Sequence, residues 1–110
     1  MGYGTHLEIL DAESGQVRSV GRLEATHTSN TGAMIAEAAG RPIREWDGER
    51  GSVVAALCVT AIRELDSLPD YYRRHEPGNG WGTLETTRAF LAEIRDECVL
   101  SPTAIFRISA

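Results

Sequence analysis

The sequence predicts an α+β domain in which an N-terminal β-hairpin and a C-terminal strand form a small sheet packed on three to four helices. Polar and apolar residues alternate near both ends of the chain, and two long central segments repeat apolar residues at helical spacing. The 110 residues are 42% hydrophobic and 25% charged. This size and balance are typical of one globular domain, assigned to residues 1–110.

The hairpin is predicted from two alternating segments. Residues 5–11 read as a half-buried strand. Residues 12–15 form a turn, in which Gly15 is able to take a positive φ. Residues 16–26 resume a weaker alternation, and because its two faces are poorly separated we expect an edge strand.

A polar stretch from His27 to Gly32 is expected to end this strand and open a short helix. Ser, Asn and Thr side chains accept hydrogen bonds from the free N–H groups of a first helical turn. Four residues share the apolar face of this helix: Met34, Ile35, Ala38 and Ala39. Gly40 is a suitable residue to end it. Residues 41–51 then form a polar loop with Ile43 and Trp46 as apolar anchors.

Two longer helices follow. Ser52 is predicted to cap the first, whose apolar stripe comprises Val54, Leu57, Cys58, Ala61, Ile62, Leu65 and Leu68. Pro69 suits the first turn of a short helix. Thr83 is predicted to begin the last helix, whose inner face comprises Leu84, Thr87, Phe90, Leu91, Ile94 and Cys98. Residues 104–109 form the final strand, with Phe106 and Ile108 facing inward.

The two polar helix starts, at residues 28–32 and 79–82, are the strongest candidates for a binding surface. Free N–H groups and a partial positive charge at a helix start suit phosphate or carboxylate. A tryptophan can stack on a ring, which stabilises binding by about 1–3 kcal/mol per base. The predicted ligand-binding residues are Ser29, Asn30, Thr31, Gly32, Trp46, Arg73, Asn79, Gly80, Trp81 and Gly82.

Further residues support or weaken the prediction of a binding surface at the two helix starts. Four arginines are candidate phosphate clamps: Arg41, Arg44, Arg73 and Arg74. The glycines around Trp81 match neither GxGxxG nor GxxxxGK[ST], so no known phosphate loop is predicted. In the alternative interpretation, Ser29 and Asn30 serve only as helix caps and Trp81 is a plug that seals the core.

Catalysis is disfavoured, and no catalytic residue is assigned. His27 beside Thr28 and Ser29 could act as a base for a hydroxyl nucleophile, but no third partner is evident. The loop acids Glu45, Asp47 and Glu49 could form an acid–base site, but the arginines around them favour ion pairs. We therefore expect a non-catalytic binding protein rather than a small hydrolase.

Metal and cofactor sites are not predicted either. His6, His27 and His75 lack metal-ligand spacing, and Cys58 and Cys98 lack CxxC spacing. Both cysteines fall on apolar helix faces, which favours reduced core residues over a disulfide. Tyr71 and Tyr72 indicate either a binding or subunit interface, or one core and one rim residue.

The net charge and the composition of individual segments limit the binding partners and the cellular location that the sequence predicts. The net charge of −5 disfavours an extended nucleic-acid surface. No signal peptide and no apolar run approaching the roughly 20 residues of a membrane span is visible, so we expect no membrane partner and a cytoplasmic protein. All eleven basic residues are arginine, which suggests a host with GC-rich codons or a virus of such a host.

Four motifs together resemble those of small proteins from bacteriophages and from bacteria that carry phage genes. They are Thr28-Ser29-Asn30, Trp46-Asp47-Gly48, Asn79-Gly80-Trp81-Gly82, and Cys98 ahead of Pro102. The resemblance covers roughly residues 26–109 and implies no established activity. A phage setting implies action against host defence in the host cytoplasm, such as a sponge that sequesters a nucleotide immune signal.

The resulting functional expectation is a homo-oligomer that binds a small anionic ligand such as a nucleotide. The alternative is an adaptor or inhibitor of a host protein that uses the acidic surface with Tyr71 and Tyr72.

Overall fold

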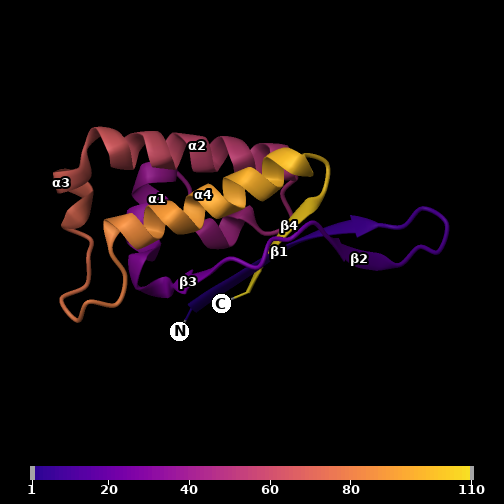
Figure 1. The fold of residues 1–110 in the computed structure, drawn as a ribbon, viewed down its shortest axis with the longest axis horizontal. Helices are drawn as coiled ribbons and strands as arrows, with labels where there is room; N and C mark the ends of the chain where they lie inside the picture. The colour runs from indigo at the N-terminus through magenta and orange to yellow at the C-terminus, as the bar shows by residue number, and fades with distance from the viewer. Residues whose placement is uncertain (1, 110) are drawn as a thin grey trace.

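The computed structural model describes residues 2–109 and confirms the α+β class, with helices packed over one face of an antiparallel sheet (Figure 1). The strands are β1 (Gly2–Leu10), β2 (Val17–Val20), β3 (Thr26–Thr28) and β4 (Ile105–Ser109). The helices are α1 (Gly32–Ala39), α2 (Gly51–Ser67), α3 (Pro69–Arg73) and α4 (Leu84–Leu100). Short 3₁₀ turns occupy Ser29–Thr31 and Ile43–Trp46.

Strand β1 is the centre of the sheet. One of its edges pairs with β2 and then with β3, and its other edge pairs with β4, all antiparallel. Leu7 lies opposite both Val20 and Phe106 in these ladders. Side chains alternate along β1, so Tyr3, Thr5 and Leu7 are buried beneath the helices.

The prediction of one strand over residues 16–26 is wrong, because that segment breaks into β2 and β3. Between them the chain bulges away from β1 and directs Leu23 and Ala25 into the core. The carbonyl of Ala25 accepts hydrogen bonds from both the backbone N–H and the hydroxyl of Thr5, at 3.1 and 2.7 Å. Burial of two apolar side chains therefore outweighs the lost ladder.

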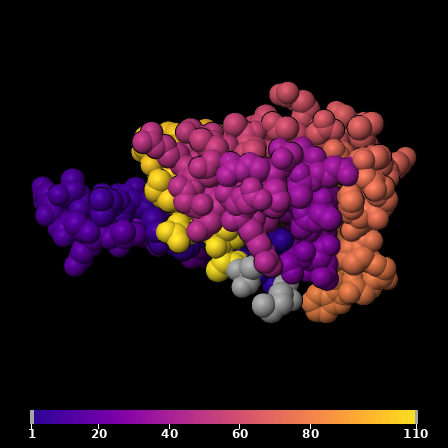
Figure 2. Space-filling model, turned by 180° about the vertical axis from the view of Figure 1, so that it is seen from behind, coloured from indigo at the N-terminus to yellow at the C-terminus, as the bar shows by residue number. Residues whose placement is uncertain are grey.

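The outer half of the β1–β2 hairpin forms an arm that projects beyond the helices, whereas α3 and the loop after it lie at the opposite end of the molecule (Figures 1 and 2). The predicted turn at the tip is confirmed, with Gly15 at φ +71°. Leu10 and Val17 pair directly across the arm and both are exposed.

Helices α2 and α4 pack antiparallel, with the start of α2 against the end of α4. A Cβ atom at Gly51 would lie 2.5 Å from the carbonyl oxygen of Ser101. This contact requires glycine, and α2 accordingly begins at Gly51 with Arg50 as its N-cap. The prediction that Ser52 caps the helix is therefore wrong by two residues.

The remaining helix predictions agree closely with the structure. All six residues expected on the inner face of α4 are buried. Thr83 caps α4 in a reciprocal capping box with Thr86, and Gly40 ends α1 with φ +80°. Leu68 departs from its predicted stripe, since it lies beyond the end of α2 and is exposed.

Cys58 and Cys98 are free thiols in the core between α2 and α4. Burial raises the pKa of the Cys98 thiol to about 12 and also raises that of Cys58. Both thiols are therefore protonated and unreactive at neutral pH. Within residues 2–109, no helix is long and apolar enough to cross a membrane.

Candidate functional site

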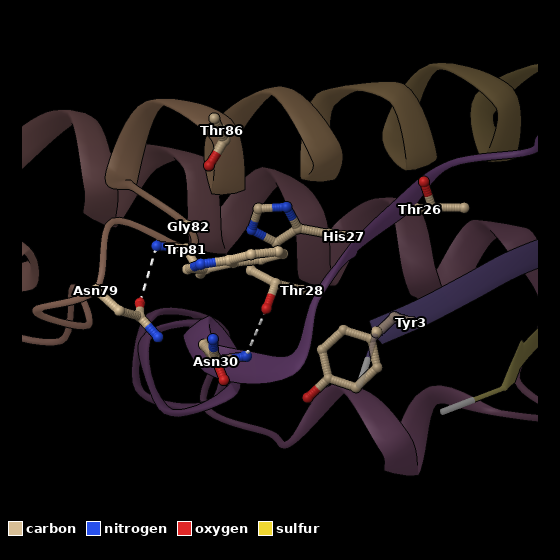
Figure 3. Close-up of a pocket in the computed structure, with 10 residues that line it drawn as sticks. Tyr3, Thr26, His27, Thr28, Asn30, Asn79, Trp81, Gly82 and Thr86 are labelled. Carbon is tan, nitrogen blue, oxygen red and sulfur yellow. Dashed lines mark hydrogen bonds between the residues drawn. The ribbon is translucent and has the colours of Figure 1, made fainter.

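A pocket of about 750 Å³ opens where the start of β1, the strand β3 and the loop before α4 meet. We call it the Trp81 pocket. Its lining comprises Gly2, Tyr3, Thr26, His27, Thr28, Asn30, Asn79, Trp81, Gly82 and Thr86. These side chains come from segments far apart in the sequence and surround one hollow (Figure 3).

The two polar helix starts predicted from the sequence are in direct contact. Gly82 has φ +106°, a backbone conformation that favours glycine. A Cβ atom there would lie 2.7 Å from Cγ2 of Thr28 and 2.8 Å from Cγ2 of Thr31. The loop before α4 can therefore lie against the Thr28–Thr31 turn only because position 82 has no side chain.

Trp81 is exposed over 68% of its surface, although it is one of the largest apolar side chains in the chain. The side-chain oxygen of Asn79 accepts the backbone N–H of Trp81 at 2.9 Å and fixes the turn that presents the indole (Figure 3). An indole so exposed does not seal the core, which removes the plug interpretation.

His27 lies on the wall of the pocket and is half-buried against α4. Its ring stacks on Phe90 with centroids 5.2 Å apart. The hydroxyl of Thr87 donates to the Thr83 carbonyl at 2.7 Å, so it accepts from Nε2–H of His27 at 3.1 Å. Burial lowers the pKa of His27. The imidazole is therefore neutral at pH 7, with Nδ1 as its acceptor nitrogen.

The Trp81 pocket is uncharged: within residues 2–109, no Arg, Lys, Asp or Glu belongs to its lining. Three of the four predicted phosphate clamps are instead paired elsewhere. Arg41 donates to Glu49, Arg73 donates to Glu76 and Glu85, and Arg74 donates to Glu37. Arg44 is exposed on the 3₁₀ turn that contains Trp46.

Four of the ten predicted ligand-binding residues line the pocket: Asn30, Asn79, Trp81 and Gly82. Ser29 and Gly80 belong to the same two segments without lining it. Thr31 is fully buried behind the lining, and Gly32 lies against the Tyr3 hydroxyl, which a Cβ atom there would approach to 2.6 Å. Arg73, at the end of α3, lies outside the lining and is engaged by glutamates.

Trp46 is fully buried, and its placement corrects the expectation that it stacks on a ligand. Its indole N–H donates to the Arg41 carbonyl at 3.2 Å, and its ring packs 6.4 Å from that of Phe106. No face of the ring is free for a ligand.

Tyr3, Thr26 and Thr86 line the pocket but were not identified from the sequence, and His27 was considered there only as a possible base. Tyr3 and His27 are cross-strand partners in β1 and β3. Strand register brings them together, and register is not visible when the strands are 20 or more residues apart. The glycines that flank Tyr3 are the sequence signal that marks this strand end as a place of close approach.

The tyrosine pair divides between core and rim. Tyr72 is buried and donates to Glu64 at 3.2 Å. Tyr71 is exposed, with the guanidinium of Arg74 4.3 Å above its ring. The pair therefore does not form one continuous tyrosine surface.

The acidic loop is occupied by structural contacts. Asp47 accepts from the Arg107 side chain and from the backbone N–H of Ile108, both at 3.0 Å. These bonds fix the loop along β4, and Glu49 accepts from Arg41 at 2.9 Å. Among the described residues, no three His, Cys, Asp or Glu side chains gather to hold a metal ion.

Comparison with known proteins returns no relative. No protein-family model, no curated protein and no solved structure matches this chain.

Proposed function

We propose that this protein is a non-catalytic binding protein for a small ligand with a planar, polar ring, such as the base of a nucleotide. The observation that carries the proposal is the exposed indole of Trp81, held by Asn79 at the mouth of a 750 Å³ hollow. A pocket of this size with an aromatic wall and a few convergent polar groups is typical of small-molecule sites.

The polar groups around the indole suit the edge of a heteroaromatic ring. The side-chain amide of Asn30 makes no hydrogen bond within residues 2–109, so it offers a donor and an acceptor. Asn79 uses its oxygen in the turn and keeps its NH₂ group as a donor. The neutral ring of His27 forms part of the same wall.

The neutral lining changes which part of the expected anionic ligand would be recognised. Since no guanidinium faces the pocket, a phosphate on the ligand would remain in solvent at its mouth. The ring would supply most of the binding energy, at about 1–3 kcal/mol for stacking on Trp81. A nucleotide remains a suitable ligand under this proposal, but recognition is of its base.

The absence of an activated nucleophile within the lining supports binding without chemistry. The hydroxyls of Thr28 and Thr86 serve in helix capping, and His27 bonds to Thr87 rather than to either of them. Binding with release of an unchanged ligand is the behaviour of a sequestering protein. A phage anti-defence sponge, acting as a homo-oligomer, is the biological role we propose on the sequence resemblance.

Tryptophan fluorescence tests this proposal, because Trp81 is exposed while Trp46 is buried. We expect nucleosides and cyclic nucleotides to quench Trp81 and leave the emission of the Trp81→Phe variant, which reports Trp46 alone, unchanged. Mass spectrometry after denaturing the complex should return the ligand intact. Equal quenching in the Trp81→Phe variant, or recovery of a cleaved ligand, would contradict the proposal.

A further inference from the structure

A second concave surface, the Arg groove, runs between the outer sides of α2 and α4, which lie side by side in Figure 1. It encloses about 400 Å³ and shares no residue with the lining of the Trp81 pocket. Its lining comprises Val59, Ile62, Arg63, Asp66, Ser67, Arg88 and Arg95.

Three guanidiniums meet one carboxylate in this groove, although the chain as a whole has a net charge of −5. Arg88 reaches across from α4 to α2 and holds Asp66 with two hydrogen bonds, at 2.7 and 2.9 Å. Within residues 2–109, the one ion-pair partner of Arg95 is its neighbour Asp96, which lies outside the lining. Arg63 has no ion-pair partner within residues 2–109. The lining therefore carries two more positive than negative side chains, on a protein whose net charge is −5.

We propose that the Arg groove docks an acidic, amphipathic segment of a partner protein. Val59 on its floor is exposed, and the buried Ile62 side chain lies beneath. An apolar residue of the partner would cover this floor, while flanking Asp or Glu side chains would meet Arg63 and Arg95. Two antiparallel helices with an apolar floor present the kind of groove that receives a third helix.

Exposure argues against a single small anion as the occupant. About two-fifths of the Arg88 side chain and a third of that of Arg95 are open to solvent. Ion pairs exposed to this degree contribute only about 0–1 kcal/mol each. A covering peptide segment shields such pairs from water and buries Val59 at the same time, which strengthens both interactions.

Charge also argues against two other occupants. A second copy placed groove against groove would bring arginines onto arginines. A nucleic acid would be repelled by the net charge of −5, and no aromatic side chain in the lining offers a base a stacking surface.

The test uses a synthetic helical peptide about four turns long, with leucines along one face and glutamates beside them. Its control has glutamine at every glutamate. Nuclear magnetic resonance titration of the full chain should move amide signals of residues 59–67 and 88–95. We expect the Glu peptide to bind at least about tenfold more tightly than the Gln peptide at low salt, an advantage that falls as salt rises.

A double variant, Arg63→Gln with Arg95→Gln, should lose about tenfold in affinity for the Glu peptide, and Trp81→Ala should lose none. Arg44→Gln is the matched control, because Arg44 is also exposed and has no ion-pair partner within residues 2–109. Equal binding of the two peptides, or an unchanged affinity in the double variant, would overturn the proposal. A single-stranded oligonucleotide that moves the same signals at lower concentration would also overturn it.

Discussion

Replacing Gly82 with alanine tests the contact on which the Trp81 pocket depends. The new Cβ atom would lie 2.7 and 2.8 Å from two threonine methyl groups, and the backbone would keep φ at +106°. Thr31 is fully buried and β-branched, so it has little freedom to move away. The backbone strain costs about 1–2 kcal/mol, and the overpacking costs about 1–3 kcal/mol. We expect the free energy of unfolding to fall by about 2–5 kcal/mol.

Alanine variants of two neighbouring glycines allow the cost of backbone strain to be measured apart from the cost of overpacking. Gly80 has φ +76° but nothing within 4 Å of an added Cβ atom, and Gly78 has neither a positive φ nor a close neighbour. Gly80→Ala should therefore show only the strain, about 1–2 kcal/mol. Gly78→Ala should be neutral or stabilising by up to about 1 kcal/mol, because alanine restricts the unfolded chain.

Urea denaturation measures the stability of the three variants. We expect Gly78→Ala to be the most stable, Gly80→Ala to be intermediate and Gly82→Ala to be the least stable. Fluorescence of Trp81 in the folded Gly82→Ala variant should also change as the loop separates from the Thr28–Thr31 turn. A Gly82→Ala variant as stable as Gly80→Ala would refute the close packing of the two helix starts.

Three further predictions follow from single groups. Thiol reagents at pH 8 should leave Cys58 and Cys98 of the folded protein unmodified, because burial raises the pKa of both thiols; rapid labelling before unfolding would contradict this. Burial holds the pKa of His27 in the folded protein below its ordinary 6.5. As pH drops below about 6.5, the unfolded chain therefore binds a proton that the folded protein does not, and the free energy of unfolding should fall. A His27→Gln variant should lose that part of the pH dependence in denaturation curves. Thr83→Ala removes a capping-box acceptor and should cost about 0.5–2 kcal/mol in urea denaturation; an unchanged midpoint would exclude a stabilising cap.

The helices could be predicted from the sequence because their signals are local. The apolar stripes of α2 and α4 and the cap at Thr83 depend on residues within one or two turns. The break at residues 21–25 could not be predicted in this way. It results from burial of Leu23 and Ala25 against other elements, and only the weak alternation of the segment hinted at it.

The two tryptophans show the same limit for the candidate site. Trp46 and Trp81 both stand in polar, glycine-containing loops, and both were expected to stack on a ligand. Packing against Phe106 buries the first, whereas the Asn79 turn exposes the second. Which loop lies over the core is a tertiary property that neither local sequence encodes.

The ion-pair partners of the arginines could not be predicted from the sequence either. Arg74 finds Glu37 at a separation of 37 residues, and Arg88 finds Asp66 at 22. The predicted phosphate clamps are arginines near the glycine loops, whereas the arginines that share a groove lie on the outer sides of two separate helices. Helical spacing marks Arg88 and Arg95 as one face of α4, but only the packing of α2 brings Arg63 to them.

The most direct test of the central claim is a calorimetric titration that compares nucleosides with their matching monophosphates. If the Trp81 pocket, whose lining within residues 2–109 has no charged side chain, recognises the ring as proposed, both forms of a bound ligand should have affinities within a few-fold of each other. Trp81→Ala should then weaken both by about tenfold to a hundredfold. Binding that requires the phosphate, or that survives unchanged in Trp81→Ala, would contradict the assignment of the Trp81 pocket as the ligand site.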